Sequence, residues 1–362
     1  MESEALVRYL RKAEKPLYLG TNMKTEVMLD KKQERKCEKI DKALQHLAEH
    51  ETKCRLCPRE CGIDRKSGEK GYCQTSTQAS LSHAVLHLGE EPVLSGIHDC
   101  ASEKTEPAFP RSGSGALFFS GCNLKCRFCQ NFQISWFNRG EKMDSDELAS
   151  RMLSLQNKGA LNINLVSPSH VIIPILKALQ KAYAWGLHLP VVYNSNGYEK
   201  AEVIRQLEGI VDIYLPDFKY FSPELSGTLS RAPDYFRFAC SSIKEMHRQR
   251  PFFVCDEREI AREGLMIRHL LLPGQHEDSM HILRWMAQNV REGIALSLMS
   301  QYKPCHKTPH SLQRSLEAEE YNLVVEKALD YGFETMFIQP EPFKEGEHRT
   351  PDFSRQNPFD WS

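Results

Sequence analysis

Strand-like and helix-like segments alternate along the chain from Ala116 onward, and no other feature constrains the fold as strongly. Apolar runs typical of strands occupy 116–119, 162–166, 190–193, 211–215, 266–272 and 294–299, with a candidate seventh at 335–338. The helical segments between them repeat apolar residues on one face, as Leu148, Met152 and Leu155 do after a capping-box pair at Asp144 and Glu147. Strands that alternate with helices are typical of a parallel sheet, so the sequence predicts an α/β fold.

Polar or turn-forming residues follow six consecutive predicted strands. In parallel α/β folds, functional residues collect at the carboxyl ends of the strands. The stretches concerned are 120–122, 167–170, 194–197, 217–219, 268–274 and 300–302. We therefore expect these residues to converge on one rim, as a single cofactor pocket requires.

Three cysteines, Cys122, Cys126 and Cys129, lie within eight residues of one predicted loop. A [4Fe–4S] cubane needs a ligand on each iron, and cysteine thiolate is the usual one. Three thiolates hold three corners and leave one iron open for chemistry, much as a catalytic zinc keeps an open position. A structural zinc site would need four closed ligands, and no histidine or cysteine follows Cys129 within easy reach. The spacing therefore favours an iron–sulfur cluster.

A second group of cysteines, Cys54, Cys57, Cys61 and Cys73, lies within twenty residues that are rich in turn-forming proline and glycine. This spacing indicates a closed four-thiolate site, for which zinc, a single iron or an auxiliary iron–sulfur cluster would fit. Free thiols in a loop are the alternative. No metal role is expected for the remaining cysteines, at 37, 100, 240, 255 and 305.

The chain of 362 residues has a formal net charge of −1, which gives no indication of nucleic-acid or membrane binding. Its start lacks the pattern of a signal peptide, and twelve cysteines then indicate metal ligands in a reducing, cytoplasmic compartment. We expect a charged helical extension at 1–50, a Cys-rich metal-binding segment with a linker at 51–110, an α/β partial barrel at 111–340 and a tail at 341–362. The linker composition itself runs from Ala101 to Gly115. Lysines and arginines between 31 and 39 are expected to form a solvated helix face.

The Cys-x3-Cys-x2-Cys spacing, with Phe128 before the last cysteine, resembles the signature loop of the radical S-adenosylmethionine (SAM) superfamily. From about Cys54 to Gln339, the chain resembles pyruvate formate-lyase activating enzyme-like members of that superfamily. The stretches that carry the resemblance are 54–61, 87–92, 118–131, 165–170, 193–197, 215–219 and 268–274.

This resemblance implies a partial (β/α)6-type barrel in which SAM binds the open iron of a [4Fe–4S] cluster. Reductive cleavage of SAM would give a 5′-deoxyadenosyl radical that abstracts hydrogen from a protein or other substrate. It also implies an electron donor of flavodoxin or ferredoxin type and, for an activase, a glycyl-radical loop as substrate. An enzyme that modifies RNA or a small molecule and a non-catalytic electron-transfer protein are the alternatives.

The resemblance also implies SAM-binding residues at the strand ends, namely Asn194, Ser195, Asp217, Lys219 and Arg268. Glycyl-radical activating enzymes carry an acidic Gly-Gly-Glu turn after the second strand, whereas this chain has Ser-Pro-Ser-His at 167–170. For four residues at or near the strand ends plainer roles are also open. Asp217 and Lys219 could form a surface pair, and His170 is expected to cap a helix. His269 is expected to be a hydrogen-bonded core histidine.

Overall fold

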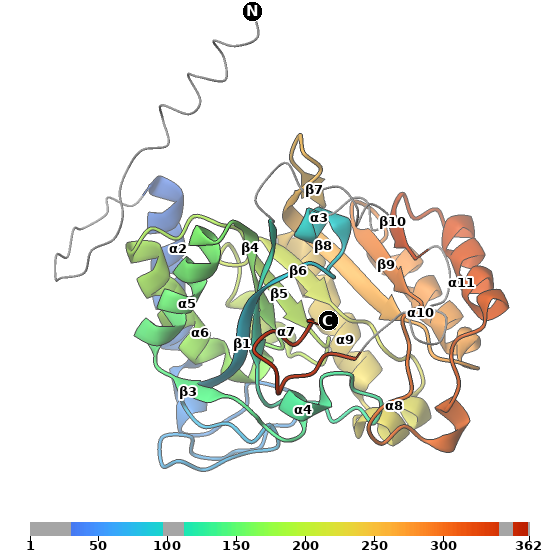
Figure 1. The fold of residues 1–362 in the computed structure, drawn as a ribbon, viewed down its shortest axis with the longest axis horizontal. Helices are drawn as coiled ribbons and strands as arrows, with labels where there is room; N and C mark the ends of the chain where they lie inside the picture. Colours follow the sequence, from blue (N-terminus) through green and yellow to red (C-terminus); the bar gives the residue numbers. More distant parts are fainter. Residues whose placement is uncertain (1–29, 97–111, 340–349, 361–362) are drawn as a thin grey trace, which may run out of the picture.

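The computed structural model describes residues 30–96, 112–339 and 350–360, which form one open ten-stranded sheet with helices packed against it (Figure 1). The strand order is β10-β9-β8-β6-β5-β4-β2-β1-β3, and β7 pairs with β8 outside this path. The strands are β1 (Ala79–His87), β2 (Gly113–Phe119), β3 (Glu141–Met143), β4 (Ala160–Val166), β5 (Val191–Ser195), β6 (Ile213–Pro216), β7 (Val254–Cys255), β8 (Ala261–Leu270), β9 (Ala295–Met299) and β10 (Thr335–Ile338).

All seven predicted strands are present, and each pairs in parallel with its neighbour in the sheet. The register places Leu117 opposite Leu165, and Leu165 opposite Tyr193. The sheet does not close, because the strand order ends at β3 on one side and at β10 on the other. The predicted α/β fold with an open parallel sheet is therefore confirmed.

Strand β1 was not predicted; it pairs antiparallel with β2 and joins the Cys-rich segment to the sheet. The linker prediction is wrong at its end, because β2 begins at Gly113. Gly115 fits a strand here for a steric reason, since an added Cβ would lie 2.6 Å from the carbonyl oxygen of Asn162. Residues 97–111, which include Cys100 and the rest of the predicted linker, lie outside the described residues.

The helices connect successive strands. They are α2 (Lys31–Leu47), η1 (Ala48–Glu51), α3 (Pro92–Ser95), α4 (Phe132–Ser135), α5 (Ser145–Asn157), η2 (Ser169–Val171), α6 (Ile172–Ala184), α7 (Ala201–Arg205), α8 (Pro223–Ser230), α9 (Tyr235–Gln249), α10 (His276–Asn289), η3 (His310–Leu312) and α11 (Ala318–Asp330). The predicted capping box is confirmed. Asp144 accepts hydrogen bonds from the backbone N–H groups of Asp146 and Glu147, and the Glu147 side chain accepts one from the backbone N–H of Asp144. A cap of this kind stabilises a helix by about 1 kcal/mol.

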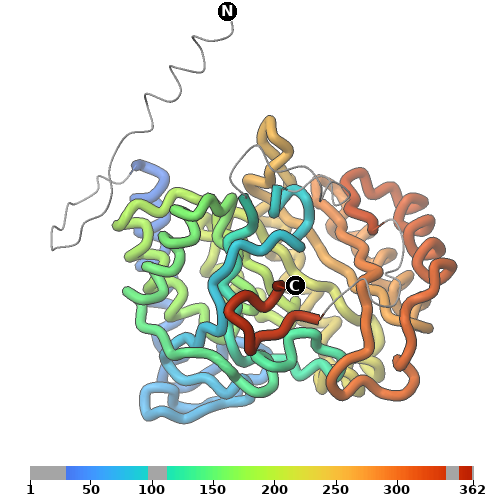
Figure 2. Tube along the Cα trace, viewed as in Figure 1, coloured from blue at the N-terminus to red at the C-terminus, as the bar shows by residue number. Residues whose placement is uncertain are grey.

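The two faces of the sheet are covered differently. Alternate strand residues such as Leu165, Tyr193 and Ile267 pack against the long helices in one large apolar core. On the other face, α3 packs into a smaller core with Val192 and Leu215. The C-terminal segment 350–360 also crosses that face beside β1 and β2 (Figures 1 and 2).

The N-terminal helix α2 packs against α6, and it corrects one expectation about the basic cluster. Lys36 is only 5% exposed, and its Nζ lies 2.5 Å from a carboxylate oxygen of the buried Asp212, just before β6. Burial lowers the pKa of Lys36 while Asp212 opposes that shift. The expected solvated face is therefore wrong for Lys36, whereas Lys32 is largely exposed.

Candidate functional site

The loop with Cys122, Cys126 and Cys129 begins directly after β2, at the carboxyl end of the parallel strands. It is anchored through Gly121, whose φ of +84° belongs to the left-handed region. A Cβ at this glycine would lie 2.4 Å from the carbonyl oxygen of Cys73 and 3.1 Å from Nε2 of His170. The first cysteine of the loop is therefore held tightly against the Cys-rich segment.

Each of the three sulfurs has a polar neighbour. Cys122 Sγ accepts hydrogen bonds from the backbone N–H of Leu124 and from Nδ2 of Asn196, both at 3.3 Å. Cys126 Sγ accepts from the hydroxyl of Ser230 at 3.0 Å. Cys129 Sγ lies 3.2 Å from the hydroxyl of Ser135. Hydrogen bonds to cluster sulfurs stabilise their negative charge and tune the reduction potential.

The protonation of these cysteines depends on a metal. Burial, and next the sulfur of Cys126, raises the pKa of the Cys122 and Cys129 thiols to about 12. A coordinating thiol nevertheless loses its proton outright. Within the described ranges, no three His, Cys, Asp or Glu side chains are arranged to hold a single metal ion. A cubane makes a different demand, because each thiolate binds a different iron atom. Three sulfurs with nearby donors fit that donor set.

The structure brings the predicted polar residues of β5 and β6 together beside this loop. Asn194 and Ser195 end β5, and the backbone N–H of Asp217 donates to the carbonyl of Ser195 at 2.8 Å. Lys219 Nζ lies 2.6 Å from Asp217, and both side chains are mostly buried, so they do not form a surface pair. Burial works against the charge of Lys219, but Asp217 and then the sulfur of Cys126 raise its pKa well above the ordinary value.

Several residues of this rim were missed at the sequence level. Tyr235 of α9 places its hydroxyl 2.8 Å from the carbonyl oxygens of both Asn196 and Asp217, and it accepts a hydrogen bond from the backbone of Lys219. Gly197 leaves room for this contact, since a Cβ there would lie 2.2 Å from the carbonyl oxygen of Asp217. Tyr235 thus joins the turns after β5 and β6, and no sequence spacing indicates such a pairing.

A buried carboxyl group, Glu199, lies just below this rim. It is fully buried and accepts a hydrogen bond from the hydroxyl of Ser169, the first residue of η2. Burial raises its pKa to about 7, although the hydrogen bond from Ser169 favours the charged form. A perturbed acid next to a proposed cofactor site is a recognised functional signal, and only the folded chain reveals it here.

Arg268 lies on β8, on the face of the sheet that carries α3. Its guanidinium forms ion pairs with both Glu90 and Glu91, with Nε 2.8 Å from Glu91. Glu90 also accepts a hydrogen bond from Asn164 of β4 at 2.9 Å. The two glutamates come from the segment before α3. They form ion pairs with the guanidinium that we expected to contact SAM, so the contact of Arg268 with SAM remains a prediction.

The two predicted histidine roles have different outcomes. His269 is a core histidine as expected, with Nδ1 2.6 Å from the carbonyl of Phe218 and Nε2 2.8 Å from the hydroxyl of Ser279. The helix-capping role of His170 is wrong, because α6 begins without a side-chain cap. Its Nε2 instead lies 2.8 Å from the carbonyl oxygen of Ser120, to which it donates. Burial lowers the pKa of His170 to about 4, so the ring is neutral at pH 7.

A cationic, partly aromatic surface borders the cysteine loop. Trp136 donates from Nε1 to the carbonyl oxygen of Cys126 at 3.0 Å. Lys125, Arg231 and Lys307 place their charged groups 5.7, 5.8 and 4.8 Å from the centre of its ring. We call Trp136, these three cations and the exposed Phe137 the Trp136 surface.

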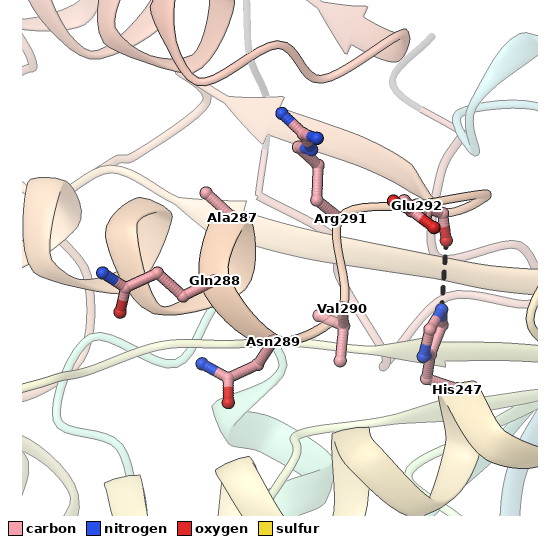
Figure 3. Close-up of a pocket in the computed structure, with 7 residues that line it drawn as sticks. All are labelled: His247, Ala287, Gln288, Asn289, Val290, Arg291 and Glu292. Carbon is pink, nitrogen blue, oxygen red and sulfur yellow. Dashed lines mark hydrogen bonds between the residues drawn. The ribbon is translucent and has the colours of Figure 1, made fainter.

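Two cavities among the described residues lie away from this loop. One of about 180 Å³ is lined by His247 and residues 287–292, at the end of α10 before β9 (Figure 3). Another, of about 390 Å³, lies between α2 and the residues that precede β6. Both are at the amino ends of the parallel strands, opposite the cysteine loop. No helix of the described residues is long and apolar enough to cross a membrane.

Comparison with known proteins gives matches over the same region. Residues 112–208 match the family described as a 4Fe-4S single cluster domain, which includes the cysteine loop. The chain is 31% identical over 297 residues to the uncharacterized protein MJ0674 of Methanocaldococcus jannaschii, a match that covers 78% of this chain and 76% of that protein. The uncharacterized protein MJ0808 of the same organism is 22% identical over 322 residues, covering 83% of this chain and 85% of that protein.

Among solved structures, methylornithine synthase (PylB) is similar with a TM-score of 0.41 and 16% identity. That match covers 60% of each chain, so this chain spans less than two thirds of that enzyme.

Proposed function

This chain belongs to the same family as the uncharacterized protein MJ0674, and from that premise we propose that it is a radical SAM enzyme. Its [4Fe–4S] cluster would be held by Cys122, Cys126 and Cys129, inside the stretch that matches a 4Fe-4S cluster domain. The observation that carries the proposal is that three cysteines, each with a polar neighbour at its sulfur, lie at the carboxyl ends of the parallel strands beside a polar rim. Such a cluster would supply the electron for the reductive cleavage of bound SAM to methionine and a 5′-deoxyadenosyl radical.

The polar rim supplies the groups that would hold the cofactor. Asn194, Ser195, Asp217 and Lys219 lie beside the cysteines, and SAM carries an amino and a carboxylate group that such side chains can bind. The ion pair of Asp217 and Lys219 offers both charges in one place. The neutral ring of His170 holds the carbonyl of Ser120 and so fixes the loop that leads into Cys122. These residues position the cofactor and keep water from it.

An electron has to reach the cluster from outside, and we propose a protein donor of flavodoxin or ferredoxin type. The Trp136 surface supports this, because Arg231 and Lys307 are exposed and none of its cations forms an ion pair with a carboxylate of the described residues. A cationic patch favours an acidic partner and accelerates its association. Trp136 donates a hydrogen bond to the carbonyl oxygen of Cys126, so an electron-donor protein docked at this surface would lie close to the cluster.

For the substrate, we propose a glycyl-radical loop of a partner protein. The sheet is open between β3 and β10, which would let a peptide loop approach the carboxyl ends of the strands. An RNA or small-molecule substrate is the second candidate, and a non-catalytic electron-transfer protein is the third. A non-catalytic electron-transfer protein would not need the polar side chains of Asn194 and Asp217 at this rim.

The proposal is tested by anaerobic reconstitution with iron and sulfide, reduction with dithionite, and addition of SAM. We expect 5′-deoxyadenosine in a chromatographic assay, together with a change in the electron paramagnetic resonance signal when SAM binds. Cys126→Ala should reduce the product to background. Cys240→Ala is the matched control, because Cys240 lies on α9 and no metal role is expected for it, and the variant should retain activity. A wild-type protein that binds a cluster but gives neither product nor spectral change would support the electron-transfer alternative.

A further inference from the structure

The four N-terminal cysteines form a compact group. Cys54 is tied to the following turn by two backbone hydrogen bonds of 2.9 Å, to Ile63 and from Gly62. The sulfur of Cys61 accepts from the backbone N–H of Tyr72 at 3.3 Å, which brings the segment before Cys73 to the same place. Cys54, Cys57 and Cys73 are buried, whereas Cys61 is exposed.

A buried arginine points at these sulfurs. Arg65 is 5% exposed, with Nε 3.2 Å from Cys54 Sγ and Nη2 3.7 Å from Cys73 Sγ. Its remaining contacts are the carbonyl oxygens of Ser76 and His170. Among the described residues, no carboxylate forms an ion pair with it. Arginine stays protonated in proteins, and a buried charge is unfavourable without a counter-charge. The sulfurs are the groups placed to provide one.

We propose that Cys54, Cys57, Cys61 and Cys73 bind a second metal centre, zinc or an iron–sulfur cluster, and that Arg65 balances its charge. Metal-bound cysteines are thiolates, and four of them leave a net negative charge on either kind of centre. That charge accounts for a buried guanidinium aimed at two of the sulfurs. Among the described residues no three of these sulfurs surround one point, so binding has to turn at least two of the cysteines inward. Cys61 is exposed and can rotate without breaking the core.

The proposed centre would also fix the position of the other cysteine loop. The carbonyl of Cys73 lies against Gly121, one residue before Cys122. Arg65 Nη1 donates to the carbonyl of His170 at 2.7 Å, and the ring of His170 donates to Ser120 at 2.8 Å. This positioning role rests on the proposed function, whereas the metal centre itself does not.

The experiment uses the full chain with the triple substitution Cys122→Ala, Cys126→Ala and Cys129→Ala, purified anaerobically and analysed for iron, zinc and acid-labile sulfide. We expect it to keep about one zinc, or about four irons with sulfide and visible absorbance. Adding Cys57→Ala and Cys73→Ala should remove that metal, and adding Cys240→Ala should not. A folded triple variant without iron or zinc, also after reconstitution, would overturn the proposal. Because no step of this experiment uses SAM, it is independent of the proposed function.

Arg65 is tested separately through the rate of metal loss to a chelator. Arg65→Met should accelerate that loss about tenfold or more, and Arg65→Lys should restore much of the retention because it keeps the charge. Arg55→Met is the matched control, since Arg55 is exposed one residue after Cys54. Equal chelation rates for Arg65→Met and Arg55→Met, with both proteins folded by circular dichroism, would exclude the counter-charge role.

Discussion

At the scale of single residues, the site depends on polar groups that are buried with few partners. Glu199 illustrates this, because its carboxyl group is fully buried and lies beside the hydroxyl of Ser169. Burial raises its pKa to about 7, so near neutral pH it exchanges a proton in the folded protein. The sequence shows only a glutamate after the turn at Gly197, and a glutamate in such a place is usually exposed.

We predict that Glu199→Gln changes the pH dependence of stability. The folded pKa is about 7, above the ordinary value of 4.5, so the folded state holds a proton that the unfolded state has released between these values. Wild-type stability should therefore fall relative to Glu199→Gln as the pH rises from 5 to 8, by up to about 3 kcal/mol. Urea unfolding at several pH values measures this. Glu141→Gln, at an exposed position of β3, is the control, and equal slopes for Glu199→Gln and wild type would contradict the prediction.

At the scale of elements, turns and helices are joined by single side chains that cross between them. Tyr235 of α9 links the turns after β5 and β6, and Lys36 links α2 to the residue before β6. Asp212 is 2% exposed and also accepts from the backbone N–H of Val191 at 2.9 Å, so it is held by the sheet as well as by α2. The N-terminal helix is therefore fixed to the sheet by a buried ion pair.

Lys36→Ala is predicted to destabilise the protein by about 3 kcal/mol, because the buried carboxylate of Asp212 loses its closest cation and keeps only Lys32 and Arg250, at 3.7 and 3.8 Å. The double variant Lys36→Ala with Asp212→Asn should recover part of this loss, since the amide oxygen can still accept from Val191. Lys32→Ala is the control, because Lys32 is an exposed cation 3.7 Å from the same carboxylate, and its loss should cost less than about 1 kcal/mol. Denaturant unfolding gives all three values, and a Lys36→Ala cost as small as that of Lys32→Ala would refute the account.

At the scale of the whole molecule, the Trp136 surface is assembled from segments far apart in the sequence. Its cations are Lys125 in the cysteine loop, Arg231 after α8 and Lys307 before η3. Backbone hydrogen bonds of 2.8 and 2.9 Å join Arg127 to Leu229 and Lys307 to Arg127, which holds the three segments together. The result is a concentration of positive charge in a chain with a net charge of −1.

We predict that reversing Arg231 and Lys307 to glutamate slows SAM cleavage with an acidic flavodoxin or ferredoxin as donor by about tenfold at low salt. The same variant should match wild type with dithionite, which needs no docking surface. The difference should shrink as salt is added, because exposed charges are screened. Arg151→Glu, on the exposed side of α5, is the control. An equal loss with both reductants would indicate damage to the site and not to docking.

Local sequence patterns predicted the individual strands and helices of this fold better than the contacts between them. The seven parallel strands and the capping box of α5 follow from residues close together in the chain, where periodicity acts directly. The antiparallel strand β1 was not predicted, because it depends on pairing with β2. The polar run at 113–115 belongs to a strand, and the close approach of a neighbouring backbone requires glycine there. His170 shows the same limit, since its partner Ser120 lies fifty residues away.

The sequence alone determined the order of the seven parallel strands, the polar strand ends and the two groups of cysteines, because spacing along the chain fixes periodicity and local ligand geometry. Only the tertiary structure decided that Asn196 and Ser230 reach the sulfurs, that Arg268 is engaged by Glu90 and Glu91, and that Arg65 points at Cys54 and Cys73. Those contacts join residues distant in sequence, and their strength depends on burial, which exists only once the chain has folded.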